Sequence, residues 1–275
     1  MKNQGMKGKK VLVTGAGTGI GRGVALEFAR EGADVVLHFS HSRDGADSAV
    51  AEIQRAGGKA CALPADFRDA RQARALAGQA ADFLGGLDVL INNAGITMNQ
   101  PFLGTTIEQF DTVFNVNIRA MFFAAQGAAE IMVKAGHGSI VNLSSNHAYA
   151  AMVEHAVYAS TKAAIVGFTR TLSLELIQKN IRVNCIAPGW VFVENHRKVM
   201  GPDFDDKAAG IGVPCGFIGE ARDIGRVAIF LVSDDSRYIV GQTILCDGGQ
   251  CTMMPGAPFR TPGDLKWGQG YVPGR

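Results

Sequence analysis

The feature of this sequence that most constrains its fold is a regular alternation of short β-branched runs with longer helical patterns. The runs "KVLVT", "DVVLHF", "KACALPA" and "LDVLINNAG" are each followed by a helical segment, and "GSIVNLSS", "IRVNCIAPG" and "GQTILCDGG" bring the expected strands to seven. Strands separated by helices pair in parallel and are covered on both faces. The pattern therefore predicts an α/β fold with a doubly wound, seven-stranded parallel sheet flanked by helices.

The domain organisation follows from where this alternation holds. It extends over residues 1–249, and a chain of 275 residues that is 47% hydrophobic can bury one large core, so we expect a single domain. Residues 190–218 break the rhythm and are expected to form an irregular substrate-loop insertion. Residues 250–275 are a Gly/Pro-rich C-terminal tail, either a disordered end or a segment that docks on the body or on a neighbouring subunit.

Composition excludes several classes of partner. The formal charge of +2 is spread along the chain, so neither nucleic acid nor an anionic membrane surface is expected as a partner. The basic N-terminus lacks the apolar run of a signal peptide, and no stretch approaches 18 apolar residues, which predicts a cytoplasmic protein. The five cysteines form no CxxC pair and the six histidines show no ligand spacing, so no metal site is expected.

A glycine-rich turn follows the first expected strand, in "VTGAGTGIGRG". Glycines are needed where a strand turns tightly into a helix and where a pyrophosphate must approach the backbone amides closely. Because this turn lies between the first strand and the first helix, we expect it to bind a dinucleotide. The candidate residues are Gly15, Thr18, Gly19, Ile20 and Gly21.

The residues after the second strand bear on the choice between NADP and NAD. An enzyme that uses NAD commonly ends this strand with Asp or Glu, which binds the adenosine ribose, whereas this chain has Phe39. Ser40, His41 and Arg43 follow and could receive a 2′-phosphate, which favours NADP, with NAD left open. Further along, Asp66 is suitably placed for the adenine amino group, and the residues Asn93, Ala94 and Gly95 end the fourth strand near the expected centre of the cofactor.

A chemically suggestive set of side chains follows the fifth strand. That strand ends at Ser145, and Tyr158 and Lys162 come 13 and 17 residues later. Positions four apart share one face of a helix, so phenol and ammonium should lie together. The Lys charge, together with a positively charged nicotinamide, should lower the pKa of the phenol toward the range that an acid or base needs near neutral pH. This arrangement predicts proton exchange by Tyr158 and positioning of the substrate oxygen by Ser145.

Taken together, residues 9–249 resemble the classical short-chain dehydrogenase/reductase family, which has a Rossmann fold. The family pattern TGxxxGxG is met by Thr14, Gly15, Gly19 and Gly21, and its NNAG motif by residues 92–95. The resemblance implies that Asn117, Ser145, Tyr158 and Lys162 are the catalytic residues. It implies for Asn117 a helix kink and a water-linked proton path to the lysine.

The resemblance carries further expectations about the cofactor and the assembly. It implies that Lys162 binds the nicotinamide ribose and that Pro188 and Gly189 shape the nicotinamide pocket. The family often has Thr where this chain has Val193, so backbone contacts around Val191 are expected to replace that side chain. The resemblance also implies a homotetramer or homodimer, which fits the apolar residues on more than one face of the helices expected at 108–134 and 157–178.

The substrate is expected to be a small molecule bordered by the residues between Ser145 and Tyr158 and those after Gly189. These segments are polar, and they include Asn146, His147, Glu154, His155, Glu194, Asn195 and His196. Several donors and acceptors suit a sugar or sugar derivative better than an acyl chain. Trp190 and Phe192 could provide a platform for a sugar face, or belong to the core.

Two other functions stay open from the sequence. A 3-oxoacyl-[acyl-carrier-protein] reductase would need basic residues beside the entrance to meet an acidic carrier protein, and Lys134 and Lys179 offer only a thin patch. A regulator that senses the dinucleotide without turnover would be favoured by a broken catalytic set, but all four catalytic residues are present.

Overall fold

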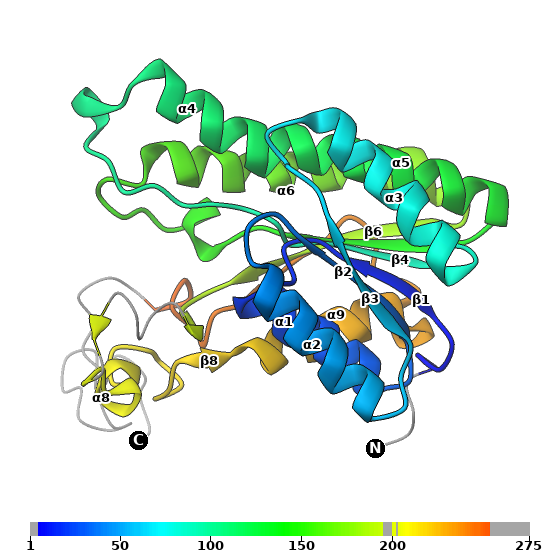
Figure 1. The fold of residues 1–275 in the computed structure, drawn as a ribbon. Coiled ribbons are helices and arrows are strands. Elements are labelled where there is room, and N and C mark those ends of the chain that lie inside the picture. The colour runs from blue at the N-terminus through cyan, green and yellow to red at the C-terminus, as the bar shows by residue number, and fades with distance from the viewer. Residues whose placement is uncertain (1–4, 195–199, 202, 254–275) are drawn as a thin grey trace, which may run out of the picture.

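A computed structural model describes residues 5–194, 200–201 and 203–253 (Figure 1). Seven parallel strands form one sheet in the order β3-β2-β1-β4-β5-β6-β9, as the alternation predicted. The strands are β1 (Lys10–Val13), β2 (Asp34–Phe39), β3 (Ala60–Pro64), β4 (Val89–Asn92), β5 (Gly138–Leu143), β6 (Ile181–Pro188) and β9 (Thr243–Cys246). Their residues are mostly buried because helices cover both faces of the sheet.

The helices divide between these two faces (Figure 1). On one face lie α1 (Gly19–Arg30), α2 (Arg43–Arg55) and α9 (Ala221–Val232). On the other lie α3 (Ala70–Leu84), α4 (Ile107–Phe114), α5 (Ala120–Ala135) and α6 (Ala156–Ile177). Local signals set several of these ends: Asp69 caps the start of α3, and α5 stops at Gly136, whose φ of 75° is a conformation that glycine adopts readily.

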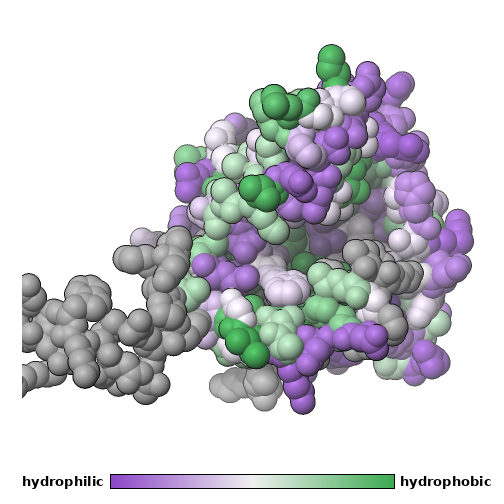
Figure 2. Space-filling model, turned by 90° about the vertical axis from the view of Figure 1, so that its left-hand side faces the viewer, coloured by the Kyte–Doolittle hydropathy of each residue, from purple (hydrophilic) through white to green (hydrophobic). Residues whose placement is uncertain are grey.

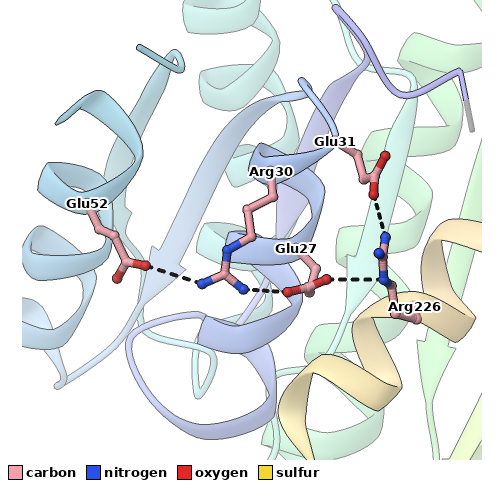
Figure 3. A network of polar contacts seen from close by, with 5 residues as sticks. All are labelled: Glu27, Arg30, Glu31, Glu52 and Arg226. Carbon is pink, nitrogen blue, oxygen red and sulfur yellow. Dashed lines mark hydrogen bonds and ion pairs between the residues drawn. The ribbon is translucent and has the colours of Figure 1, made fainter. Parts of the chain in front are cut away.

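An ion-pair network centred on one buried carboxylate joins the three helices of the first face (Figure 3). Glu27 of α1, only 4% exposed at its side chain, binds Arg30 at 2.5 Å and Arg226 of α9 at 3.4 Å. Arg226 also pairs with Glu31, and Arg30 reaches Glu52 of α2 at 3.5 Å. Glu27 therefore has two cationic partners, which offset the cost of burying its charge.

The described part of the expected insertion at 190–218 contains regular secondary structure. It contains β7 (Val191–Phe192), which pairs in parallel with β8 (Gly219–Glu220), and the short helix α8 (Asp206–Gly210). The predicted contacts of Asn195 and His196, and the tail beyond Met253, lie outside the described residues. Among the helices of the described part, none is long and apolar enough to cross a membrane.

Candidate active site

A cleft of about 660 Å³ lies at the carboxyl ends of the strands. Figure 2 shows this side of the molecule, hollowed near its centre. The cleft opens beside β1 and β4, which are neighbours in the sheet although the helices that follow them cover opposite faces. Open α/β sheets bind their ligands at this point, where the connections change from one face of the sheet to the other.

The glycine-rich turn has no room for a side chain at Gly15 or Gly21. Gly15 has a φ of +64°, and a Cβ there would lie 2.8 Å from Cα of Ala94. A Cβ on Gly21 would lie 2.3 Å from Nδ2 of Asn93. The Asn93 amide in turn donates to the carbonyls of Thr14 and Gly15, at 2.9 and 3.0 Å. These contacts hold the end of β1 against the end of β4. The start of α1 lies beside them, where backbone amides can bind an anion, and a protein carboxylate, that of Glu194, already accepts from the Gly19 amide.

Most of the predicted cofactor residues line the cleft. They are Gly15, Thr18, Gly19, Ile20, Ser40, His41, Asp66, Asn93, Ala94, Gly95, Tyr158, Lys162, Pro188 and Gly189. Gly21, Arg43 and Val191 are not part of this wall. Gly21 packs against the turn itself, Val191 is buried in β7, and Val193, which the family pattern had marked as a departure, lines the cleft instead.

The end of the cleft beside β2 and β3 holds a carboxylate that is already paired. Arg43 is outside the cleft wall, but its guanidinium lies 4.9 Å from the centre of the Phe39 ring, which lines the cleft. Asp66 accepts hydrogen bonds from Arg68, which lower the pKa of this carboxyl to about 2. Asp66 is thus ionised and can accept a hydrogen bond from an adenine amino group while Arg68 holds it. The sequence interpretation had missed Arg68, which also lines the cleft.

The predicted catalytic side chains meet at the other end of the cleft. Ser145 follows β5, and Tyr158 and Lys162 lie one turn apart in α6; all three line the cleft. Lys162 is 5% exposed, and its Nζ donates to the carbonyl of Leu143 at 3.0 Å. The neighbouring Ser144 donates to the Lys162 carbonyl at 2.7 Å, so its hydroxyl is engaged in holding the helix to the strand.

The expected lowering of the Tyr158 pKa is not found in the protein alone. Burial raises the pKa of Tyr158, and a hydrogen bond with Ser145 only partly opposes this effect. The ammonium of Lys162 lies 5.5 Å from the ring centre, and burial lowers the pKa of Lys162 itself to about 8. Tyr158 is therefore protonated at neutral pH, the form that can give a proton to a substrate oxygen.

Asn117 lies behind this wall rather than in it. A π-helical turn, η2 (Asn115–Arg119), separates α4 from α5, which is the helix break that the family resemblance implied. Oδ1 of the buried Asn117 side chain accepts from the backbone amide of Ile96 at 2.8 Å, and its Nδ2 donates to the hydroxyl of Thr161 at 3.1 Å. Gly95 lies between Asn117 and Lys162. A Cβ on this glycine would be 3.2 Å from Oδ1 of Asn117 and 3.7 Å from Nζ of Lys162.

The predicted substrate residues fall into two groups. His147 and His155 pack beside Tyr158: their ring centres are 4.8 Å apart and lie 5.5 and 6.2 Å from that of Tyr158. Nδ1 of His147 is buried without a hydrogen-bond partner among the described residues. Burial and the nearby His155 both lower the pKa of His147.

Glu194 and Asn146 bind protein groups instead. The Glu194 carboxylate accepts from the Gly19 amide at 3.0 Å, at the start of α1. Asn146 donates to Gln250 at 3.4 Å, and Gln250 also accepts from the Trp190 amide at 3.0 Å. Gln250 was missed because the sequence interpretation had assigned it to the tail, where no local signal marks it.

Comparison with known proteins identifies relatives that cover nearly the whole chain. Residues 15–250 match the protein family described as enoyl-(acyl carrier protein) reductase. The chain is 39% identical over 259 residues to hydroxynaphthalene reductase-like protein Arp2 of Metarhizium anisopliae, covering 90% of this chain and 96% of the relative. It is 35% identical over 245 residues to an L-rhamnose 1-dehydrogenase (NAD(P)(+)) of Sphingomonas sp., covering 89% and 96%. A short chain dehydrogenase from Burkholderia cenocepacia, solved in complex with NADP, is 34% identical, with a TM-score of 0.81 and coverage of 89% and 98%.

Proposed function

The chain belongs to the classical short-chain dehydrogenase/reductase family and is an NAD(P)-dependent oxidoreductase, and from this premise we propose that it acts on a secondary alcohol or carbonyl of a sugar or sugar derivative. The observation that carries the chemistry is the meeting of Ser145, Tyr158 and Lys162 on one wall of the cleft. The nicotinamide, when bound, accepts or supplies the hydride.

Each of these side chains has a defined task in the proposed reaction. Tyr158 gives its phenolic proton to the substrate oxygen in reduction and takes it back in oxidation. Ser145, which lines the cleft together with Tyr158, holds the same oxygen. Lys162 binds the cofactor ribose and supplies positive charge that favours the phenolate once Tyr158 has lost its proton. Asn117 supports the path that returns protons to Lys162.

We propose NADP as the favoured cofactor. Phe39 ends β2 in place of an acidic residue, and Ser40 and His41 line the cleft beside it. Arg43 stacks over Phe39 at the same corner, where its charge can attract a 2′-phosphate. The cofactor's pyrophosphate would bind at the glycine-rich turn and the start of α1, which offer backbone amides.

The sugar class is supported by the polar groups around Tyr158. The rings of His147 and His155 pack beside Tyr158, with centres 5.5 and 6.2 Å from that of the phenol, although neither histidine is part of the described cleft lining. A site with such groups discriminates strongly for a substrate that carries the matching hydroxyl. The similarity to an L-rhamnose 1-dehydrogenase points in the same direction.

A hydroxylated aromatic substrate is a second candidate. Ile96 and Val116 form an apolar part of the cleft wall, and one relative is named a hydroxynaphthalene reductase-like protein. The 3-oxoacyl carrier-protein alternative gains no support from charge, because Lys134 and Lys179 lie near the ends of α5 and α6 that adjoin the starts of β5 and β6, opposite the cleft.

Initial rates with NADP and NAD across aldoses, polyols, polyhydroxylated aromatic ketones and 3-oxoacyl thioesters test this proposal. We expect turnover with at least one aldose or polyol and a lower KM for NADP than for NAD. Turnover confined to the aromatic compounds would favour the second candidate. Turnover confined to thioesters would refute the sugar assignment.

We also propose that the chain forms a homodimer or homotetramer through α6. The helix exposes Ala163, Ala164 and Gly167 on one side, and Leu174 on the same helix is 72% exposed. Small residues allow a second helix to approach closely, and Gly167 has open space where a Cβ would be. Light scattering should report an oligomer for the wild type and a smaller species for Gly167→Arg, whereas Gly78→Arg, at an equally open position in α3, should leave the mass unchanged.

A further inference from the structure

His38 is a buried polar residue that the reaction described above does not use. It lies in β2, is 1% exposed, and lines the adenosine half of the cleft. Its neighbours Val36 and Leu37 are part of the hydrophobic core, so an imidazole here needs hydrogen-bond partners to offset its burial.

Both ring nitrogens of His38 are engaged with backbone on opposite sides of the strand end. The Gly15 amide donates to Nδ1 at 3.1 Å, and Nε2 lies 3.0 Å from the carbonyl oxygen of Ala65. The ring stacks on Phe67 with centres 4.2 Å apart and planes 16° from parallel. The carbonyl of His38 also accepts from the Ala16 amide at 2.7 Å.

These partners determine the tautomer of the ring. A backbone amide can only donate and a carbonyl can only accept, so Nδ1 must be the acceptor and Nε2 must carry the proton. The neutral ring is the only form that satisfies both. Burial favours the same form, because it lowers the pKa of His38 to about 4.

The two backbone groups belong to different walls of the adenosine site. Gly15 begins the turn whose amides face the expected pyrophosphate, and Ala65 precedes Asp66 and Phe67, which line the opposite wall. The glycine-rich turn is already held to the end of β4 by the side chain of Asn93. The side chain of His38 links the same turn to the end of β3.

We propose that His38 is a positioning residue for the dinucleotide, which sets the separation between the glycine-rich turn and the adenine wall through its two hydrogen bonds. This inference rests on the proposed placement of the cofactor in the cleft. It predicts that losing the ring weakens cofactor binding without slowing the chemical step, because Ser145, Tyr158 and Lys162 lie on β5 and α6, away from these bonds.

The test compares three variants by titrating NADPH fluorescence and by measuring kcat at saturating cofactor. His38→Leu keeps the volume approximately but removes both hydrogen bonds, and should raise the Kd at least tenfold while kcat stays within about threefold. His38→Gln retains one acceptor and one donor and should fall between the Leu variant and the wild type. Val36→Ala is the control, since it removes buried volume from the same face of β2 and should leave the Kd within about twofold.

Two results would overturn the inference: a Kd for His38→Leu equal to that of the wild type, or an equally large increase for Val36→Ala. If the Leu variant does not fold, the comparison of His38→Gln with the control decides the same question. A wild-type protein that binds neither NADPH nor NADH would refute the cofactor placement and this inference together, whereas unchanged binding by the His38 variants would refute the inference alone.

Discussion

Acidification should destabilise this protein through His38. The unfolded chain takes up a proton on this residue near pH 6.5, whereas the folded protein resists protonation until about pH 4. Between these values the unfolded state holds more protons, so the free energy of unfolding falls as the pH falls. At 1.36 kcal/mol for each pH unit, the loss is about 2 kcal/mol at pH 5 and about 3 kcal/mol once the pH is below 4. Above pH 6.5 the full contribution is present.

Urea unfolding of the wild type and of His38→Leu at pH 7.5 and pH 5 measures this effect. The Leu variant should be less stable at pH 7.5, because the Gly15 amide and the Ala65 carbonyl lose their partner. It should then lose about 2 kcal/mol less than the wild type on going to pH 5. The other titrating groups are common to both proteins, so the difference between the two losses isolates His38. Equal losses would refute the reasoning.

Three further perturbations test the site and the packing. Tyr158→Phe should lower kcat about a thousandfold or more while the Kd for NADPH stays nearly unchanged, and retained turnover would contradict the role of the phenol. Arg226→Met should lower the free energy of unfolding by about 2 kcal/mol and the Tm by about 4–8 °C in a thermal scan, because Glu27 stays buried with one cationic partner fewer; an unchanged Tm would contradict this. Glu194→Ala should tighten NADPH binding about threefold by titration, because no side-chain oxygen then competes for the Gly19 amide, and weaker binding would contradict this competition.

Local patterns were sufficient to predict the architecture. Each strand and helix is determined mainly by residues within a few positions, so the seven strands and the helix expected at 157–178, observed as Ala156–Ile177, could be located from the sequence. The same holds for Tyr158 and Lys162, whose four-residue spacing places them on one helix face.

Properties that depend on distant segments could not be predicted in this way. The sequence indicated a lysine and a charged nicotinamide that together lower the Tyr158 pKa. In the protein alone the burial of Tyr158 and Lys162 dominates, and burial is a property of the assembled core. Glu194 was expected at the substrate and instead binds an amide 175 residues earlier in the chain. The sequence offered Lys134 and Lys179 as a thin basic patch for a carrier protein. The direction of α5 and α6 places both lysines opposite the cleft.

By itself, the sequence determined the order of strands and helices, the glycine-rich turn and the set of reactive side chains, because each of these depends on spacing along the chain. Only the tertiary structure decided which polar groups are buried and which partners they find. His38 shows the difference: in "VVLHF" it is one histidine in an apolar run, whereas in the fold its ring joins Gly15 to Ala65 across two loops. Such a contact depends on how the sheet brings separate loops together, and no periodicity along the chain encodes it.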